Sequence, residues 1–311
     1  MLDRTRKPKP ATIERALFAR QRQLLLLLDA LGGEVKNLDF QKLLFLYCQE
    51  IGTAPPYEFV PYKFGAFSFT SYADRRKLIE RGYLIDDPQN WQLTDAGAQI
   101  VGKTADLQLS EFAKRHHALR GDALVADTYR RFPFHASRSE IAPRVLRGDR
   151  RSLARIDEAR APEGGKALNT IGYEGHSLES YLNVLLKAGI TQLCDVRRNA
   201  LSRKYGFSKS TLSNACVGVG IRYEHIPELG IASDKRQKLE AQADYDVLFR
   251  EYERDWLPKK TIEIEKIVDW VREGQRVALT CYEHLSTQCH RGCLAKVLEK
   301  KMGKEKSARH L

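Results

Sequence analysis

A short segment near the end of the chain brings together residue types that carry out chemistry. In VALTCYEHLSTQCHRGCLAKVLEKKMG, residues 277–303, an apolar strand is expected to run into Cys281 and Glu283, and Cys289 and His290 are expected to open a helix. The N-terminus of a helix carries a partial positive charge, which favours thiolates and bound anions. The segment therefore predicts a place for chemistry or ligand binding, without fixing the reaction.

Three interpretations of this cluster stay open. In the first, Cys281 or Cys289 is a nucleophile, held as a thiolate by the helix end and by the cationic residues beside it. In the second, zinc is bound through the spacing C-x7-C-H-x2-C, whose ligands would be Cys281, Cys289, His290 and Cys293. In the third, the cysteines are small apolar residues packed between a strand and a helix. No cofactor or metal is predicted, and zinc is kept as an alternative.

The second half of the chain alternates apolar strands with helices. Strands are expected in ALNTIGY (167–173), ITQLCDVR (190–197), IRYEHIPELG (221–230) and RVALTCY (276–282). Apolar runs of this length, separated by helices, are typical of a parallel sheet that is covered on both faces. We therefore expect an α/β domain, a small Rossmann-like three-layer fold with about four parallel strands.

Polar residues follow each expected strand. In a parallel sheet, ligands bind outside the carboxyl ends of the strands, because the loops there and the following helix N-termini face one crevice. Carboxylates, guanidinium groups and thiols should therefore meet at one edge of the sheet. The residues expected to act in catalysis are Glu174, Asp195, Glu283, Cys289 and His290.

The loop after the second expected strand, residues 197–209, is rich in cationic and aromatic side chains. Arginine forks match phosphate oxygens bidentately, and Ser208 could cap the next helix beside them. Aromatic side chains interleaved with arginine also hold unstacked bases, although a loop that is merely solvated is the alternative. The residues expected to contact the substrate are Tyr173, Arg197, Arg198, Ser202, Arg203, Lys204, Tyr205, Phe207, Cys281 and Arg291.

These motifs resemble a known prokaryotic family. The segments TIGYEGHS (170–177), CDVRRNALSRKYGFSKSTL (194–212), IRYEHIPELG (221–230) and ALTCYEHLSTQCHRGCLA (278–295) are similar to the family of domain of unknown function 488, over residues 167–300. The resemblance implies the family's recurring arginine, cysteine and glutamate positions and no settled activity. Cys293 falls where similar chains commonly have a small residue or leucine, which weakens a four-ligand zinc site.

The first half has a different pattern. A helix is expected up to Leu31, ended by Gly32-Gly33, then a second leucine-rich helix, a helix over 71–81, and two short strands around the turn Asp86-Asp87-Pro88. This order is typical of a winged helix-turn-helix. The segments QKLLFLYCQE and PYKFGAFSF also resemble the winged-helix-like Panacea domains of antitoxin-type proteins, which implies a module that contacts DNA or a protein partner in phage defence.

Changes of composition predict four regions. Residues 1–10 are expected to be a flexible basic arm, 11–102 the winged-helix-like domain, 103–165 a helical linker region, and 166–311 the α/β domain. The last boundary rests on Pro162, Gly164 and Gly165, which break the preceding helical pattern.

The whole chain is basic. It has 311 residues, a formal net charge of +12 and six cysteines, and the basic excess is shared between its two halves. Such a balance favours an anionic partner, nucleic acid first and nucleotides second. The longest apolar run, Leu24 to Leu28, is too short to cross a bilayer, so we expect a cytoplasmic protein with reduced cysteines and no membrane partner.

These observations lead to one functional hypothesis and its rivals. We expect a nucleic-acid-associated protein whose C-terminal domain binds, and processes as an enzyme, a nucleotide or nucleic-acid base. A ligand-sensing transcriptional regulator and an antitoxin-like adaptor, both without catalysis, remain the alternatives, and a homodimer is left open.

Overall fold

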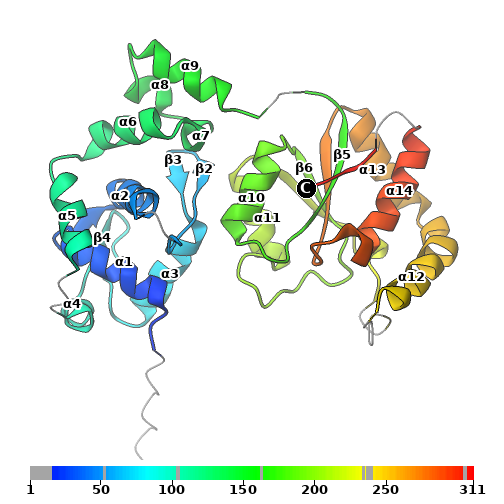
Figure 1. The fold of residues 1–311 in the computed structure, drawn as a ribbon, viewed down its shortest axis with the longest axis horizontal. Helices are drawn as coiled ribbons and strands as arrows, with labels where there is room; N and C mark the ends of the chain where they lie inside the picture. Colours follow the sequence, from blue (N-terminus) through cyan, green and yellow to red (C-terminus); the bar gives the residue numbers. More distant parts are fainter. Residues whose placement is uncertain are drawn as a thin grey trace, which may run out of the picture.

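The computed structural model describes residues 16–51, 54–102, 106–161, 164–232, 235, 241–303 and 307–311. The expected basic arm, residues 1–10, lies outside these ranges. Figure 1 shows two lobes: elements α1 to α9 form one, and the sheet with its helices from β5 onward forms the other.

The first lobe is mostly helical. Gly32 and Gly33, both with positive φ, end the first helix, and the Ser68 hydroxyl caps the third by accepting from the Ser71 amide. Its elements are α1 (Ala19–Ala30), β1 (Glu34–Lys36), α2 (Asn37–Glu50), β2 (Val60–Tyr62), β3 (Gly65–Phe67), α3 (Phe69–Glu80), β4 (Asn90–Gln92) and α4 (Asp95–Val101).

The strands of this lobe form two small antiparallel sheets. β1 pairs with β4, and β2 pairs with β3 in a hairpin between α2 and α3. The segment expected to form two wing strands is more irregular than predicted, because its first strand is reduced to an isolated bridge between Leu84 and Leu93. The intervening turn is closed by the Asp87 carboxylate, which accepts from the amides of Gln89 and Asn90.

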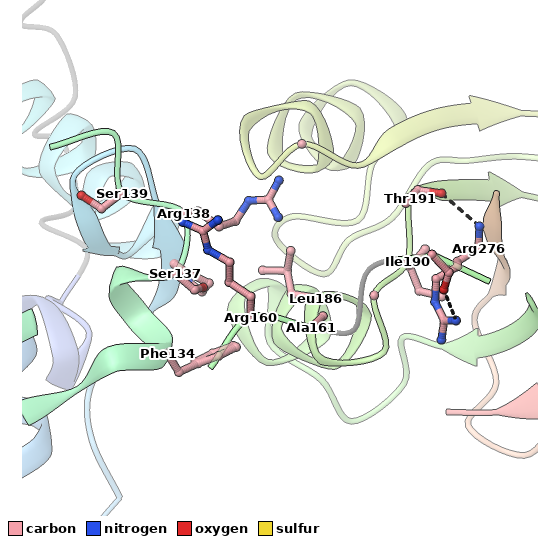
Figure 2. Close-up of a pocket in the computed structure, with 14 residues that line it drawn as sticks. Phe134, Ser137, Arg138, Ser139, Arg160, Ala161, Leu186, Ile190, Thr191 and Arg276 are labelled. Atoms are coloured by element: carbon pink, nitrogen blue, oxygen red, sulfur yellow. Dashed lines mark hydrogen bonds between the residues drawn. The ribbon is translucent and has the colours of Figure 1, made fainter. Parts of the chain in front are cut away.

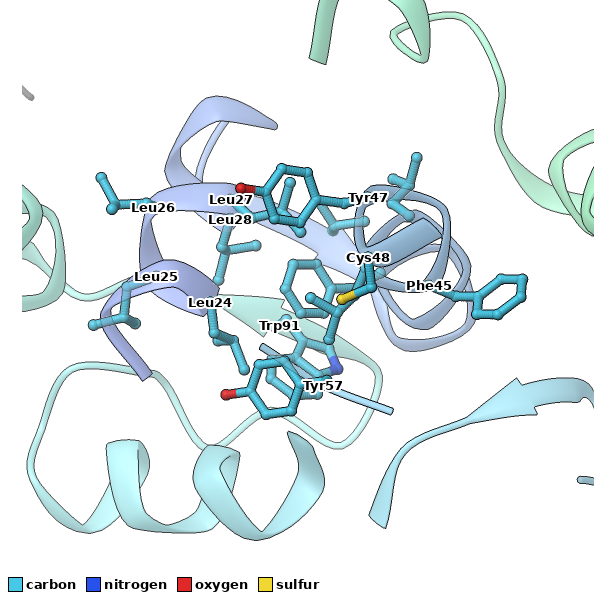
Figure 3. Packing of buried hydrophobic residues seen from close by; sticks show 14 of the residues in the cluster. Leu24, Leu25, Leu26, Leu27, Leu28, Phe45, Tyr47, Cys48, Tyr57 and Trp91 are labelled. Atoms are coloured by element: carbon cyan, nitrogen blue, oxygen red, sulfur yellow. The ribbon is translucent and has the colours of Figure 1, made fainter. Parts of the chain in front are cut away.

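The five leucines of α1, Leu24 to Leu28, are all buried. Five consecutive leucines point to all sides of a helix, so this part of α1 needs packing partners on more than one side. Figure 3 shows Leu24 and Leu28 directed towards Trp91, whereas Leu25 and Leu26 point to the other side of the helix. There α1 contacts α4 and α5, so helices beyond residue 103 complete the same core.

Residues 106–161 continue as short helices packed on this lobe. Pro133 lies at the first turn of a helix, where its missing amide hydrogen is not needed, and thus separates two helices. The helices are α5 (Leu107–Arg115), α6 (Gly121–Arg131), α7 (Pro133–Ala136), α8 (Ala142–Val145) and α9 (Arg150–Glu158).

The C-terminal lobe contains a five-stranded parallel sheet, which confirms the predicted α/β class. Its strand order is β7-β6-β8-β5-β9. The strands are β5 (Ala167–Gly172), β6 (Gln192–Asp195), β7 (Arg222–His225), β8 (Arg276–Cys281) and β9 (Arg309–His310). Four of them match the expected strands, and β9 was not expected. The order differs from the commonest doubly wound sheet, in which the first two strands of the domain are neighbours, because β8 lies between β5 and β6.

Helices cover both faces of this sheet. α10 (Leu178–Lys187) and α11 (Lys209–Gly218) pack on one face, and α12 (Gln242–Glu251), α13 (Thr261–Arg272) and α14 (His290–Met302) on the other. The chain after β6 therefore leaves towards one face and the chain after the neighbouring β8 towards the opposite face. The carboxyl ends of β6 and β8 therefore form a switch point of the sheet, the position at which ligands bind in such sheets.

The helical segment from Gln242 to Arg272 is interrupted. A π-helical turn over Tyr252–Trp256 and a 3-10 turn over Leu257–Lys259 separate α12 from α13. Pro258 explains the break, since it has no amide hydrogen to continue the helical ladder.

The two lobes are joined by a buried polar contact. The carboxylate of Glu179, in α10, accepts from the Ser68 hydroxyl and from the Thr70 amide and hydroxyl at the start of α3, at 3.1, 2.7 and 2.9 Å. A carboxylate at a helix N-terminus satisfies free amides and complements the helix dipole. Val60, from β2, also packs in the core of α10 and α11.

Within the described ranges, the helices are too short or too polar for any of them to span a bilayer.

Candidate functional site

The segments that follow β5, β6 and β8 converge at the carboxyl edge of the sheet. The Glu174 carboxylate, after β5, accepts from the His284 amide, after β8, at 2.8 Å. The His290 Nε2, at the start of α14, contacts the Val196 carbonyl, after β6, at 3.0 Å. Residues that are far apart in the sequence thus meet at one edge. We call the segments that follow β5, β6 and β8 at this edge the carboxyl-edge site.

Arg197 is not exposed to a ligand, although a phosphate contact was expected. Its guanidinium forms a buried ion pair with Asp195, with Nε donating to Oδ1 at 2.8 Å. Its Nη1 donates to the Tyr173 hydroxyl and the Phe207 carbonyl. Desolvation lowers the pKa of Arg197, but the contacts with Asp195 outweigh it and the pKa lies above its ordinary value. Arg197 and Asp195 therefore hold the loop on the sheet, and Asp195 is not free for proton transfer.

Two of the expected stacking residues are also buried. Tyr173 and Phe207 stack on each other with ring centroids 4.4 Å apart and an interplanar angle of 10°. Both lie in the apolar core under α10 and α11. The two rings support the loop, and neither is exposed to stack on a nucleic-acid base. Tyr205, in contrast, is 43 % exposed.

The serines of the loop fix its turn. The Ser208 hydroxyl donates to the Ser202 carbonyl and accepts from the Ser202 amide. Ser208 occupies the position before α11, but its side chain makes no capping hydrogen bond, which corrects the expected role. The Ser202 hydroxyl accepts from the Lys204 amide, so it serves the loop's own conformation.

Three of the expected cationic contacts do face solvent. Arg198, Arg203 and Lys204 are exposed on the loop after β6. The Lys204 ammonium lies 3.4 Å from the Tyr173 carbonyl, above the carboxyl end of β5. Tyr205, next in sequence, donates to the Phe69 carbonyl at the start of α3, at 3.2 Å.

The loop therefore adjoins the first lobe. Arg76, an exposed residue of α3, interacts with the Tyr205 hydroxyl. We call the set Arg76, Arg198, Arg203, Lys204 and Tyr205 the cationic rim. Arg76 was not expected in the site, because nothing in the sequence links α3 to a loop more than a hundred residues away.

Cys281, Cys289 and His290 form a compact buried cluster. The His290 Nδ1 lies 3.9 Å from the Cys281 Sγ and 4.0 Å from the Cys289 Sγ. All three are fully or almost fully buried. Burial raises the pKa of the Cys289 thiol to about 12, so the helix end does not hold it as the expected thiolate. Cys281, expected to contact substrate, points into this cluster.

Cys293 lies outside the cluster, on the next turn of α14. Burial also raises the pKa of Cys293 to about 12. The expected four-ligand arrangement is therefore reduced to three potential ligands, namely Cys281, Cys289 and His290.

Arg291 positions the turn that carries Glu283. It is 1 % exposed, and its guanidinium donates to the carbonyls of Glu283 and His284, the latter at 2.7 Å. Gly172 lies on the other side, where an added Cβ would come within 1.8 Å of the Glu283 carbonyl oxygen. Arg291 is thus a positioning residue and not the expected substrate contact. The Glu283 side chain is half-buried, with one oxygen 3.5 Å from the Cys281 Sγ.

Tyr282 is a residue of the site that sequence reasoning left out. Its ring is 45 % exposed and meets Tyr173 edge-on, with centroids 5.3 Å apart. The sequence could have indicated the exposure of Tyr282, because side chains alternate between the two faces of a strand. Cys281 faces inward, so the next residue faces the other way.

A cavity of about 510 Å³ lies at the opposite, amino edge of the sheet. Figure 2 shows Arg138 and Arg160 in the space between the two lobes and Arg276 beside Thr191, at the beginning of β8 and before β6. The Arg276 guanidinium donates hydrogen bonds to carbonyl groups, including that of Ala188. Desolvation by burial, with Arg160 nearby, lowers the pKa of Arg138. None of the residues named for the carboxyl-edge site lines this cavity.

Comparison with curated proteins and with solved structures gave no significant match. A family model described as "Domain of unknown function DUF488" matches residues 177–298, which contain the loop after β6, Cys281, Glu283 and the start of α14. The match leaves the first lobe uncovered, so its resemblance to Panacea-type domains stays a prediction. The C-terminal α/β domain is therefore similar to DUF488 over these residues, and the family's description states no activity.

Proposed function

We propose that the C-terminal domain binds a single-stranded nucleic acid or a nucleotide across the cationic rim and the exposed face of Tyr282. The observation that carries the proposal is that some of the cationic side chains at the carboxyl edge are buried and others are exposed. The buried Arg197 and Arg291 donate hydrogen bonds to protein groups, whereas Arg198, Arg203 and Lys204 are exposed to solvent. Exposed cations beside exposed aromatic rings suit a phosphate backbone and unstacked bases.

The position of the rim supports the same proposal. It lies where the chain leaves neighbouring strands towards opposite faces, the usual ligand site of a parallel sheet. The amino-edge cavity also contains arginines, but it lies at the wrong end of the strands for this rule. The net charge of +12 adds attraction for polyanions.

The first lobe supports a nucleic-acid partner independently. We propose that this lobe is a winged helix with one additional hairpin, and its order of α1, β1, α2, α3 and an irregular hairpin, with β1 paired to β4, supports this. In helix-turn-helix proteins the second helix of the motif enters the DNA groove. Here that helix is α3, which presents Arg76 and Lys77 to solvent. We propose that α3 and the cationic rim bind one nucleic acid together.

Processing of the bound base or nucleotide is part of the proposal, with revised roles for the residues. Asp195 is held by Arg197, and Cys289 is almost fully buried, so a bound ligand does not reach it. The groups at the edge of the site that can reach a ligand are Glu174, which is exposed, and Glu283, which is half-buried. These two carboxylates are the candidates for proton transfer.

A binding titration of the whole protein tests the proposal. We expect Arg203→Ala/Lys204→Ala to weaken binding of a fluorescent single-stranded oligonucleotide about tenfold, because two phosphate contacts are lost. The slope of log affinity against log salt should fall by about 1.4. Fluorescence anisotropy at several salt concentrations measures both quantities.

The matched control is Lys300→Ala/Lys301→Ala. It removes the same charge from two exposed residues at the far end of α14, away from the carboxyl edge. The control should retain wild-type affinity to within about twofold, the small change expected when charges far from the site are removed. Equal losses in the two variants would refute the rim and leave only non-specific attraction.

A further inference from the structure

We propose that Cys281, Cys289 and His290 form a zinc site with three protein ligands. Their ligand atoms, two sulfurs and one imidazole nitrogen, all lie within 4.8 Å of one another. The residues come from two elements, the end of β8 and the start of α14, so the fold brings together two parts of the chain to build the cluster. The site is separate from the proposed nucleic-acid contacts and does not depend on them.

The spacing of the three atoms suits tetrahedral zinc. Zinc–sulfur bonds near 2.3 Å and zinc–nitrogen bonds near 2.0–2.1 Å at tetrahedral angles place sulfur and nitrogen about 3.6 Å apart. The observed separations from His290 Nδ1 are 3.9 Å to Cys281 and 4.0 Å to Cys289. A shift of a few tenths of an ångström brings the ligands onto one ion.

Adjacent residues in a chain seldom share an ion, yet here the backbone allows it. Cys289 is extended, with φ −139° and ψ 135°, and His290 is the first residue of α14. The change from extended to helical backbone between them turns both side chains towards Cys281.

The histidine is oriented as a metal ligand requires. A carbonyl oxygen only accepts hydrogen bonds, so the contact of 3.0 Å with the Val196 carbonyl places the hydrogen of His290 on Nε2. The lone pair of Nδ1 then points towards the two sulfurs. An imidazole whose second nitrogen donates to a carbonyl is the usual outer arrangement around a bound metal.

The surroundings hold the ring in this orientation. The Tyr252 ring packs edge-on against His290, with centroids 5.7 Å apart, and the Tyr252 hydroxyl donates to the Leu229 carbonyl. Arg291 fixes the carbonyls of the turn after β8. The ligands are therefore preorganised from both sides.

The donor set selects zinc over hard cations. Thiolate and imidazole ligands favour zinc, whereas calcium and magnesium require oxygen ligands. Two thiolates also balance the charge of a divalent ion, which a buried site needs. The carboxylate of Glu283, 3.5 Å from the Cys281 Sγ, lies beside the remaining coordination position. A site with three protein ligands and one open position is the arrangement of catalytic zinc.

Metal analysis of the full-length protein tests the assignment. We expect about one zinc per chain when the protein is purified with a thiol reductant and without chelator. After zinc removal, Co²⁺ alone should restore a near-ultraviolet thiolate-to-cobalt absorption with visible bands of tetrahedral cobalt. Cys281→Ser and Cys289→Ser should each lose bound zinc, and His290→Gln should weaken cobalt binding at least tenfold.

Cys293→Ser is the matched control, because Cys293 is a buried cysteine on the same helix but outside the cluster. It should keep full zinc content and the wild-type cobalt spectrum. The cobalt spectrum of the wild-type protein does not depend on whether the variants fold. The proposal is overturned if the wild-type protein neither contains zinc nor takes up Co²⁺, or if zinc persists in both Cys281→Ser and Cys289→Ser.

Discussion

Arg197 and Arg203 lie six residues apart in one loop, yet their side chains have opposite surroundings. Arg197 is 5 % exposed and is paired with the fully buried Asp195, whereas Arg203 faces solvent. A buried charge must be paired and hydrogen-bonded, so Arg197 is bound by its own protein. The same contrast separates the buried Tyr173 from the exposed Tyr282. Ligand contacts are therefore assigned to the exposed member of each pair.

A buried lysine in the first lobe gives a pH-dependent prediction. Lys42 is buried in α2, donates to the Ala66 carbonyl at 2.9 Å, and has its pKa lowered by desolvation to about 7. Between about pH 7 and pH 10 the unfolded chain, with an ordinary lysine pKa, binds more protons than the folded protein. The free energy of unfolding should therefore rise with pH across this window by a few kcal/mol.

Lys42→Met should remove that rise. We expect the variant to be more stable than wild type by about 2–4 kcal/mol at pH 6.5, with a difference that shrinks towards pH 10. Urea unfolding at several pH values measures it. Lys209→Met serves as the control, because it makes the same substitution at an exposed position. Parallel curves for wild type and Lys42→Met would contradict a lowered pKa.

The sequence indicated which residue types gather at the site but not which of them are buried. Arg197 and Arg203 are the same residue type, and the burial of Arg197 depends on its tertiary contacts with Tyr173 and Phe207. The cluster of Cys281, Cys289 and His290 was recognisable from spacing. The exclusion of Cys293 was not, because it follows from the direction in which α14 turns its side chains.

At the scale of elements, the close approach of β5 to the turn after β8 shapes the site. Glu174 accepts from His284, Arg291 holds the carbonyls of the turn, and Gly172 leaves room for the Glu283 carbonyl. Strands and turn must stay in this register for Cys281 to face His290. A change in the approach of β5 should therefore disturb the fold and the site together.

Gly172→Ala tests this dependence. An added Cβ would come within 1.8 Å of the Glu283 carbonyl oxygen, a backbone atom that cannot rotate away. We expect a loss of about 1–3 kcal/mol in the free energy of unfolding, the usual cost of overpacking. Urea unfolding monitored by tryptophan fluorescence provides the measurement.

Gly218→Ala is the matched control. Its added Cβ would meet only the Tyr62 side chain, at 2.9 Å, and Gly218 lies in α11, where alanine favours the helix. Its cost should stay below about 1 kcal/mol, because the ring can move aside. A Gly172→Ala protein as stable as wild type would show that the turn after β8 is free to shift.

Strong local patterns made several elements predictable. The apolar runs of β5, β6, β7 and β8 appear close to their expected places. β9 has two residues and no apolar run, so its pairing with β5 depends on contacts such as Thr170 with His310. The position of β8 between β5 and β6 depends on tertiary contacts, which the hydropathy of the sequence does not encode. That position nevertheless creates the switch point at which the site lies.

At the scale of the whole molecule, the contact between the lobes decides which surfaces a ligand can touch together. Glu179 is buried at the N-terminus of α3, and Tyr205 donates to the Phe69 carbonyl. Desolvation raises the pKa of Glu179, although three donors oppose this. These contacts place the exposed Arg76 of α3 next to the loop after β6. Neither half of the sequence predicted this shared surface alone.

Hydrogen–deuterium exchange of the whole protein, with and without a single-stranded oligonucleotide, would locate the surface that binds nucleic acid. We predict slower amide exchange on binding in residues 197–209 and 282–289, the loops that carry the rim and Tyr282. The amino-edge cavity around Arg138, Arg160 and Arg276 serves as an internal reference and should be unchanged. Binding that protects the amino edge and leaves both carboxyl-edge loops unprotected would contradict the account.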